Sequence, residues 1–341
     1  MPARFVARLE RVHADLGRED ALAAVLTGLA APRTPSVRVN TLRADTPSVR
    51  AELDQAGVAT QTVDWYADAL LLDMAPGQTP EQLQERVRAV QETQAYQRGA
   101  LYLQGLASMT APLALAPAPD EHVLDMAAAP GGKTTQLACL MQGVGPGGRL
   151  LANDSSRRRV YKLRAVLEAQ GAQAVETICR TGQGLGRAHP GAFDAVLLDA
   201  PCSAEARVAP GSPEAESWTP RRIPRLASLQ RQLLSSAIAA TRPGGRIVYA
   251  TCTFAPEENE AVVEHALTRH AGDVEVAPLD LSLPPALPGL TRWGRKTFAP
   301  GLAHTRRLLP GPGIEGFFLA MLRRTTGASG DASDSTPANS R

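Results

Sequence analysis

Two cysteines stand where an apolar run gives way to a polar loop. Cys202 ends the segment Asp199-Ala-Pro-Cys, and Cys252 lies in Ala-Thr-Cys-Thr. A free cysteine is most often buried as a small apolar side chain, which suits Cys139 in a predicted helix and Cys179 in a predicted strand. Burial suits Cys202 and Cys252 poorly, because polar side chains flank both. These two thiols are therefore candidates for chemistry.

A second unusual segment is the small-residue turn DMAAAPGGKT at 125–134. Such a turn lets a ligand approach the backbone closely, just before a helix N-terminus with free N–H groups. Lys133, in this turn, is the only lysine in the first 161 residues. The loop within this turn consists of Ala127, Ala128, Ala129, Pro130, Gly131, Gly132 and Lys133.

Short apolar runs alternate with helical patterns from about residue 96 onward. The runs are 122–127, 149–154, 174–179, 194–199, 246–252 and 316–324, and the helical patterns are 134–142, 156–170, 225–241 and 256–269. This alternation predicts an α/β fold with a doubly wound, mostly parallel sheet.

Ligands of such a sheet bind beyond the carboxyl ends of the strands. Asp125, Asp154 and Asp199 lie at the ends of the first, second and fourth apolar runs. A carboxylate at the position of Asp154 is placed to accept hydrogen bonds from ribose hydroxyls. The pattern therefore brings three carboxylates and the thiols of Cys202 and Cys252 to one rim.

The first 95 residues follow a different pattern, typical of a smaller α+β domain. Helical patterns over 3–30 and 48–56 accompany strand patterns over 36–41 and 70–72. A further helix begins after Thr79, with Gln82 closing a capping box. The chain is thus predicted to have an N-terminal accessory domain (1–95), a Rossmann-like domain (96–324) and a disordered tail (325–341).

Composition limits the class of protein. Apolar residues make up 44% and charged residues 21% of the 341 residues, as in globular proteins. No apolar run is long enough to span a membrane, and the four cysteines lack the spacing of metal ligands. We expect a cytoplasmic protein with reduced thiols that binds no metal ion and is not associated with a membrane. Arginine supplies 33 of the 36 basic residues, which favours nucleic acid only weakly.

An ATPase is the competing hypothesis. Residues 127–134 satisfy a relaxed phosphate-loop pattern, and AVLLDA at 195–200 is similar to the strand that ends in a magnesium-binding aspartate. However, Pro130 removes one of the N–H donors that a phosphate would need, and this hypothesis gives neither Cys202 nor Cys252 a task.

Taken in order, the motifs resemble a known family. DMAAAPGGKT, LLDAPCS and VYATCTFAPEENE are similar to motifs of the RNA (cytosine-5) methyltransferases of the Fmu/Sun type, which use S-adenosylmethionine. SVRVNTLR (36–43), LYLQGLASM (101–109) and RRLLPGPGIEGFFLAML (306–322) extend the resemblance over about residues 35–324. The motifs look most like those of bacterial enzymes that modify small-subunit ribosomal RNA.

The resemblance implies a role for each site residue. The loop 127–133 would wrap the methionine part of the cofactor, and Asp154 would bind its ribose. Asp199 would lie beside both the cofactor and the target cytosine. Cys252 would attack C6 of the base, Cys202 would assist release of the product, and Lys133 would favour the thiolate. The substrate would be an unpaired or flipped cytosine.

The sequence departs from the family pattern at two places. Ala204 stands where the family has glycine, which argues against a tight loop with positive φ there. The family aspartate that binds adenine is missing near Thr181, which leaves Thr181, Gln183 or backbone for this task. The chain also ends near the close of the catalytic domain, so we expect residues 1–95 or a partner to select the RNA.

These features together predict a monomeric, S-adenosylmethionine-dependent RNA cytosine-5 methyltransferase. Its expected substrate is 16S ribosomal RNA, with transfer RNA as the alternative. An RNA-binding ribosome-assembly factor with weak catalysis is the alternative from another class.

Overall fold

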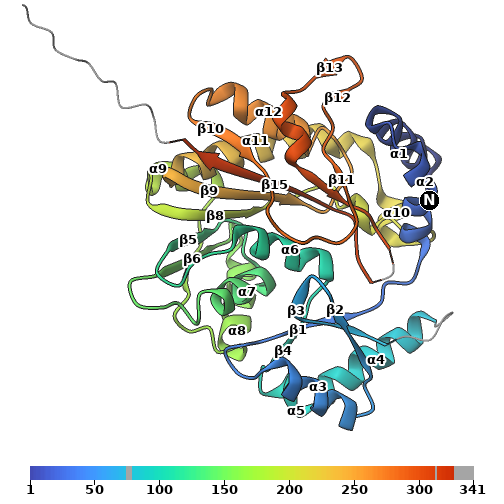
Figure 1. Cartoon of the computed structure of the whole chain (residues 1–341), viewed down its shortest axis with the longest axis vertical. Helices are drawn as coiled ribbons and strands as arrows, with labels where there is room; N and C mark the ends of the chain where they lie inside the picture. The colour runs from blue at the N-terminus through green and yellow to red at the C-terminus, as the bar shows by residue number, and fades with distance from the viewer. Residues whose placement is uncertain (74–78, 312, 326–341) are drawn as a thin grey trace, which may run out of the picture.

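The computed structural model of the chain describes residues 1–73, 79–311 and 313–325. Its described part holds a four-stranded sheet and a nine-stranded sheet, which lie one below the other in Figure 1. Apart from Thr325, the tail that the sequence predicts to be disordered lies outside the described residues.

The parallel part of the large sheet is the predicted doubly wound sheet. Its strands, in sheet order, are β7 (Glu176–Ile178), β6 (Arg149–Asn153), β5 (His122–Asp125), β8 (Phe193–Asp199) and β9 (Thr241–Thr251). All four pairings between these neighbours are parallel. Because β5 pairs with β6 on one side and β8 on the other, the strand order reverses there, which is where such sheets bind ligands.

Antiparallel strands extend this sheet beyond β9. β15 (Phe317–Arg324) pairs with β9, and β14 (Arg306–Leu308) and β11 (Ala286–Pro288) follow it. β10 (Val274–Ala277) pairs with another stretch of β15. The expected strand over 316–324 is thus present, and it runs against its neighbour β9.

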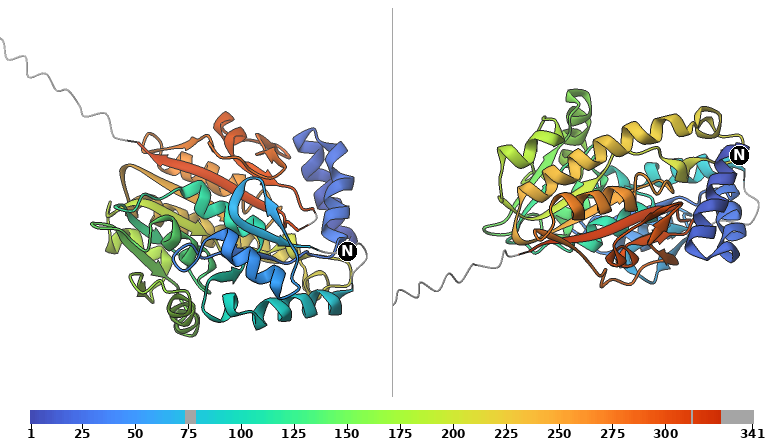
Figure 2. Two further views of the ribbon diagram at one scale, coloured as in Figure 1. Left: turned by 60° about the horizontal axis from the view of Figure 1, so that its bottom comes forward. Right: turned by 90° about the horizontal axis from the view of Figure 1, so that it is seen from above.

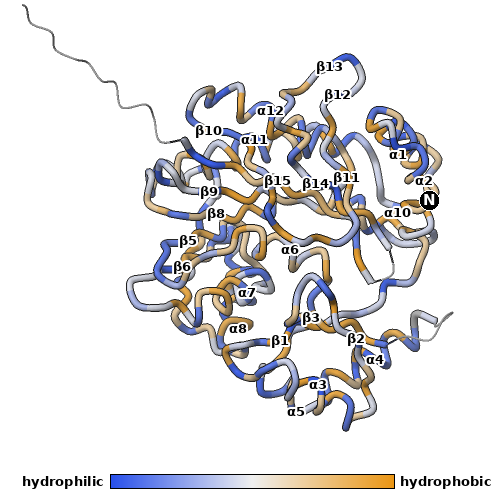
Figure 3. The backbone as a smooth tube through the Cα atoms, viewed as in Figure 1, coloured by the Kyte–Doolittle hydropathy of each residue, from blue (hydrophilic) through white to orange (hydrophobic). Residues whose placement is uncertain are grey.

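Helices cover both faces of the large sheet, as a parallel sheet requires (Figure 2). Alternate residues of β9 point to opposite faces of the sheet. Tyr249 packs in the hydrophobic cluster that includes side chains of α11 (Ile223–Ala240) and α12 (Glu260–Arg269). Val248 packs in the other cluster, which holds α6 (Leu106–Leu115), α7 (Gly132–Leu140) and α8 (Arg157–Ala169). The central strands are hydrophobic along their length (Figure 3).

The prediction that α12 starts at residue 256 was wrong by one turn. Residues 256–259 form turns, and the helix begins at Glu260. The side chains of Glu258 and Asn259 in these turns are fully buried, and they accept hydrogen bonds from Ser203 N and from Thr251 Oγ1. The predicted strand over 174–179 is likewise shorter, because β7 ends at Ile178.

The N-terminal segment divides into two structural parts. The helical pattern over 3–30 is two helices, α1 (Ala3–Leu16) and α2 (Glu19–Ala30), because Gly17 ends the first with φ 64°. Their apolar faces pack on Val208 and Phe254 of the larger domain.

The second part is the four-stranded sheet with its helices. In sheet order its strands are β2 (Thr60–Val63), β3 (Tyr66–Leu72), β1 (Ser36–Val39) and β4 (Leu101–Leu103). Its helices are α3 (Thr46–Gln55), α4 (Pro80–Glu92) and α5 (Gln94–Gln97). The capping box of Thr79 and Gln82 is confirmed at the start of α4. The predicted domain boundary at residue 95 falls inside α5, and β4, the edge strand of this sheet, follows it.

Short elements complete the described chain. They are η1 (Gly182–Gly184), α9 (Leu185–Ala188), η2 (Glu205–Arg207), α10 (Pro213–Ser217), η3 (Pro220–Arg222), β12 (Arg292–Trp293), β13 (Lys296–Thr297) and η4 (Pro300–His304). None of the helices described is both long and apolar enough to cross a membrane.

Candidate active site

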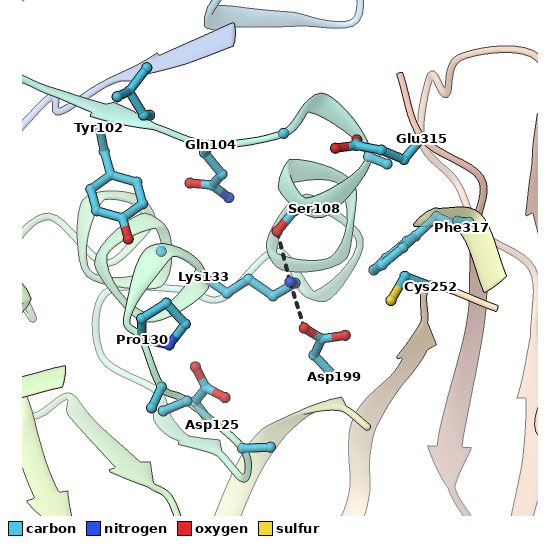
Figure 4. A pocket seen from close by; sticks show the side chains of 18 of the residues that line it. Tyr102, Gln104, Ser108, Asp125, Pro130, Lys133, Asp199, Cys252, Glu315 and Phe317 are labelled. Atoms are coloured by element: carbon cyan, nitrogen blue, oxygen red, sulfur yellow. Dashed lines mark hydrogen bonds and ion pairs between the residues drawn. The ribbon is translucent and has the colours of Figure 1, made fainter. Parts of the chain in front are cut away.

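A cavity of about 440 Å³ lies at the carboxyl ends of β5, β8 and β9, between the two sheets (Figure 4). Asp199 lines it from the end of β8, and Lys133 lines it from the first turn of α7. Tyr102 and Gln104 line it from the segment that begins with β4. From the small-residue loop, the lining residues are Ala127, Ala128, Ala129, Pro130 and Gly132. The loop that the sequence predicts to bind a ligand therefore forms one wall of the cavity.

Lys133 and Asp199 form an ion pair inside the cavity. Lys133 Nζ lies 2.6 Å from Asp199 Oδ2 and donates a second hydrogen bond to Ser108 Oγ at 2.7 Å (Figure 4). Burial alone would lower the pKa of Lys133, but the charge and hydrogen bond of Asp199 outweigh it and raise that pKa. Lys133 is therefore a fixed cation beside a carboxylate.

Asp125 is a second carboxylate at this cavity, almost completely buried. It accepts a hydrogen bond from Thr134 Oγ1 at 2.8 Å. Burial raises its pKa to about 7. A buried carboxyl with this pKa is poised to take a cationic ligand, because a positive charge nearby would favour its ionised form.

The glycines of the loop are required by close packing. A Cβ atom on Gly132 would lie 2.9 Å from Tyr102 Cε1. Gly131 has φ 124°, and a Cβ there would lie 3.0 Å from Val166 Cγ1. The backbone therefore runs close to both β4 and α8.

The two candidate thiols meet at the edge of the cavity. The Sγ atoms of Cys202 and Cys252 lie 3.3 Å apart, although the residues are 50 positions apart in the chain. Cys252 lines the cavity beside Phe317, whereas Cys202 lines a separate small pocket with Trp218 and Arg222.

The contact between the thiols makes them chemically unequal. The hydrogen bond with Cys202 lowers the pKa of Cys252. Burial and the charge of Asp199 oppose this shift, and the charges of Arg207 and Lys133 add to it. The same hydrogen bond, together with burial, raises the pKa of Cys202. Cys252 is therefore the thiol that ionises first and Cys202 the one that keeps its proton.

Not every predicted residue reaches the cavity. Asp154 is buried at the end of β6 and outside the lining, with Oδ1 accepting from Ser156 N and Oδ2 lying 3.2 Å from Arg159 Nη1. Gly131 is also outside the lining.

Two expectations about single residues were wrong. Ala204 adopts φ 56°, so the loop after Cys202 keeps the left-handed turn despite the Cβ atom. Cys179 is exposed rather than buried, because β7 ends one residue earlier. Cys139 is buried as expected.

Sequence reasoning missed several lining residues. Tyr102, Gln104 and Ser108 belong to the motif at 101–109, and Phe317 belongs to the one at 306–322, but the resemblance alone gave these residues no role. Arg207 was not singled out at all. For Tyr102, Gln104, Ser108 and Phe317, the only signal in the sequence was that they belong to these motifs.

The geometry does not favour the ATPase hypothesis. Lys133 is bonded to Asp199 and Ser108, and the hydroxyl of Thr134, which would hold magnesium in a phosphate loop, is bonded to Asp125. Among the residues described, no group of three or more His, Cys, Asp or Glu side chains is arranged to hold a metal ion.

The sheet order, the small-residue loop after β5 and the cavity beside it define the class I methyltransferase fold. A crystal structure titled "Methyltransferase Homolog Protein from Pyrococcus Horikoshii" matches 95% of this chain and 100% of that one, with a TM-score of 0.76 and 29% identity. The structure of "NSun6 from Pyrococcus horikoshii with SFG" shares the fold, with a TM-score of 0.75 at 23% identity over 95% of this chain and 98% of that one.

The chain belongs to the family described as "16S rRNA methyltransferase RsmB/F", whose sequence model matches residues 112–323. "Ribosomal RNA small subunit methyltransferase F" of Klebsiella pneumoniae is 35% identical over 95% of this chain and 64% of its own length. The protein of the same name from Cronobacter sakazakii is 35% identical over 93% of this chain and 61% of its own length. The chain therefore spans less than two thirds of the length of these curated relatives.

Proposed function

We propose that this protein transfers the methyl group of S-adenosylmethionine to C5 of cytosine in small-subunit ribosomal RNA. The observation that carries the proposal is the 3.3 Å contact of Cys202 and Cys252 at the rim of a cavity that holds the Lys133–Asp199 pair. The names of the curated relatives support ribosomal RNA as the substrate.

The cavity suits S-adenosylmethionine, the cofactor of this class of enzymes. Its buried carboxyl, Asp125, has a raised pKa that a cationic ligand would lower again. We assign the loop 127–133 to the methionine part, Asp154 to the ribose, and Asp199 to the boundary of cofactor and base. When bound, the cofactor supplies an electrophilic methyl group on a sulfonium.

Cys252 is assigned the attack on the base. Cytosine C5 is too weak a nucleophile to take a methyl group unaided. A bond from Cys252 Sγ to C6 moves an electron pair toward C5, which then becomes nucleophilic. The lowered pKa of Cys252 supplies the thiolate that this attack needs.

Cys202 is assigned the release step. After methyl transfer, C5 carries both the methyl group and a hydrogen, and loss of that proton restores the C5–C6 double bond. As the electron pair returns, the bond from C6 to Cys252 Sγ breaks and leaves a thiolate. While Cys252 is bonded to C6 it carries no negative charge, so Cys202 can release its own proton to solvent. The resulting Cys202 thiolate, adjacent to Cys252, then accepts the C5 proton.

The substrate base must leave any helical stack to reach this cavity. We therefore propose that the enzyme acts on an unpaired or flipped cytosine, as a monomer in the cytoplasm. The predicted accessory domain (1–95), whose sheet continues into the cavity wall at Tyr102, is proposed to guide the RNA.

Substitution of each thiol tests the assignment. Cys252→Ala should abolish methyl transfer, and Cys202→Ala should leave a covalent protein–RNA adduct that persists on a denaturing gel. Cys179→Ala, which changes an exposed thiol away from the cavity, is the matched control. Full activity of Cys252→Ala would overturn the assignment of the nucleophile.

Two measurements separate the alternative functions. Bisulfite sequencing of RNA from a strain that lacks this protein should show a lost 5-methylcytosine in small-subunit ribosomal RNA, whereas a loss in transfer RNA would indicate the other substrate. Calorimetry with S-adenosylmethionine tests an assembly factor without catalysis, since absence of binding at millimolar cofactor would contradict an enzyme.

A further inference from the structure

The segment that follows the Cys252 motif, PEENE at 256–260, has no task in the chemistry above, yet its middle residues are fully buried at the thiols. We propose that this segment positions both thiols, with Asn259 fixing the residues on either side of Cys252 and Glu258 fixing the loop of Cys202. This inference deepens the proposed function and rests on it.

Asn259 holds both neighbours of Cys252. Thr251 Oγ1 donates to Asn259 Oδ1 at 2.6 Å, and Asn259 Nδ2 donates to the carbonyl oxygen of Thr253 at 2.9 Å. One amide thus bridges the residue before the thiol and the residue after it. Thr251, Thr253 and Asn259 are all 2% exposed or less, so water does not compete for these bonds.

Glu258 holds the loop of Cys202 in the same way, with help from Gln230 of α11. The N–H of Ser203 donates to Glu258 Oε2 at 3.0 Å. Gln230 Nε2 donates both to Glu258 Oε2 and to the carbonyl oxygen of Pro201, each at 2.8 Å. The residues before and after Cys202 are therefore tied to one buried pair of side chains.

The support is reciprocal, because the Cys202 loop also holds the Cys252 loop. Glu205, three residues after Cys202, accepts from Thr253 Oγ1 at 3.0 Å and from Phe254 N at 3.2 Å. The hydroxyls of Ser203 and Thr253 lie 2.8 Å apart. Each loop supplies a carboxylate to the other, which fixes the 3.3 Å separation of the two Sγ atoms.

The neighbouring acidic residues of the segment point elsewhere. Glu257 pairs with Arg8 of α1 and accepts from Trp293 Nε1. Glu260 forms a buried ion pair with Arg307 of β14. Only Glu258 and Asn259 of PEENE bond to the residues that flank the thiols, so Glu257 provides a matched control from the same segment.

The first experiment separates the two halves of the reaction. RNA carrying 5-fluorocytosine traps the adduct, because the fluorine at C5 cannot leave as a proton, and so reports formation alone. Asn259→Ala should slow formation about 100-fold, the scale expected for a displaced reacting group. Glu258→Ala should form the adduct but resolve it on unmodified RNA at least tenfold more slowly, and Glu257→Gln should match the wild type in both steps.

The conservative variant distinguishes positioning from the simple loss of a buried group. Glu258→Gln keeps an oxygen that can accept from Ser203 N and Gln230. The other oxygen, Oε1, which has no hydrogen-bond partner among the described residues, becomes the amide nitrogen. It should therefore restore resolution to within a fewfold of the wild type. If Glu258→Ala does not fold, Gln230→Met serves in its place. It removes the hydrogen bonds from α11 to Pro201 and Glu258, and should slow resolution of the adduct to the same extent.

A second readout does not need RNA. The rate of alkylation of Cys252 by iodoacetamide against pH reports the ionisation of its thiol. Its midpoint should rise in both Asn259→Ala and Glu258→Ala, because the contact with Cys202 is lost, and stay unchanged in Glu257→Gln. Unchanged midpoints in both alanine variants would overturn the positioning role. If the midpoints shift in both alanine variants but the wild-type protein forms no adduct with the RNA, the proposed function alone is overturned.

Discussion

The cofactor half and the thiol half of the active site use carboxylates in different ways. In the cofactor half, Asp199 is paired with the cation Lys133, and Asp125 lies alongside at the cavity. In the thiol half, every hydrogen bond that the side chains of Glu205 and Glu258 accept within the described part of the chain comes from a neutral donor. These donors are backbone N–H groups, a threonine hydroxyl, an indole and an amide.

The difference follows from what each half has to do. A cavity wall that binds charged ligands must present charge, and Asp199 does so beside the cation Lys133. A loop that must hold a sulfur atom in place needs several hydrogen bonds at one point, and a carboxylate accepts more of them than any other side chain. Burial raises the pKa of Glu205 and Glu258, so these hubs depend on hydrogen bonding rather than on charge.

The largest effect is expected from removing the cation of the cofactor half, which tests whether that half depends on charge. Lys133→Met should leave Asp199 without its ion partner and reduce methyl transfer about 100-fold or more, as expected when a fixed charge is lost at a reacting centre. Initial rates with labelled S-adenosylmethionine measure the change. Lys162→Met, on the exposed face of α8, serves as the control. A variant that keeps half of the wild-type rate would show that the pair is only structural.

The free energy of unfolding should depend on pH through Asp125. Its pKa is about 7 when folded and near 3.8 otherwise, so between these values the folded state holds a proton that the unfolded state has lost. Stability from this group therefore falls as pH rises from about 4 to 7, by roughly 4 kcal/mol at about 1.4 kcal/mol for each pKa unit.

Asp125→Asn should remove this pH dependence of the free energy of unfolding, because an amide does not titrate. The variant should be more stable than the wild type at pH 8, and the two should converge at pH 4, as measured by urea unfolding at each pH. Asp120→Asn, at an exposed turn before β5, controls for the general effect of a lost charge. A difference between variant and wild type that does not change with pH would contradict the raised pKa.

Much of this site follows from local pattern. Strand ends and a small-residue turn are set by neighbours in sequence, so the placement of Lys133, Asp199 and Cys252 around one cavity could be predicted. Tyr102 reaches the cavity because β4 joins the small sheet, and Phe317 because β15 runs antiparallel beside β9. Such contacts depend on how distant elements pair, which periodicity does not encode.

The hydrogen-bonded hubs of the thiol half show the same limit. PEENE was expected to open a helix, and its acidic residues are typical of a first helical turn. Instead the turns at 256–259 precede α12 and bury Glu258 against the loop of Cys202. Helix propensity was outweighed by hydrogen bonds to a segment more than 50 residues away.

Ala204 gives the smallest expected effect and tests how tightly the thiol half constrains its backbone. A left-handed conformation costs a residue with a Cβ atom about 1–2 kcal/mol, and much of the gain from glycine is offset by its greater freedom when unfolded. Ala204→Gly should therefore stabilise the protein by about 0.5 kcal/mol, measured by urea unfolding, with methyl transfer unchanged. Ala206→Gly, at a buried position without positive φ, should destabilise it. If Ala204→Gly lowers stability as much as Ala206→Gly, the turn carries no strain, and the hydrogen bonds of Glu205 and Glu258 alone hold the loop.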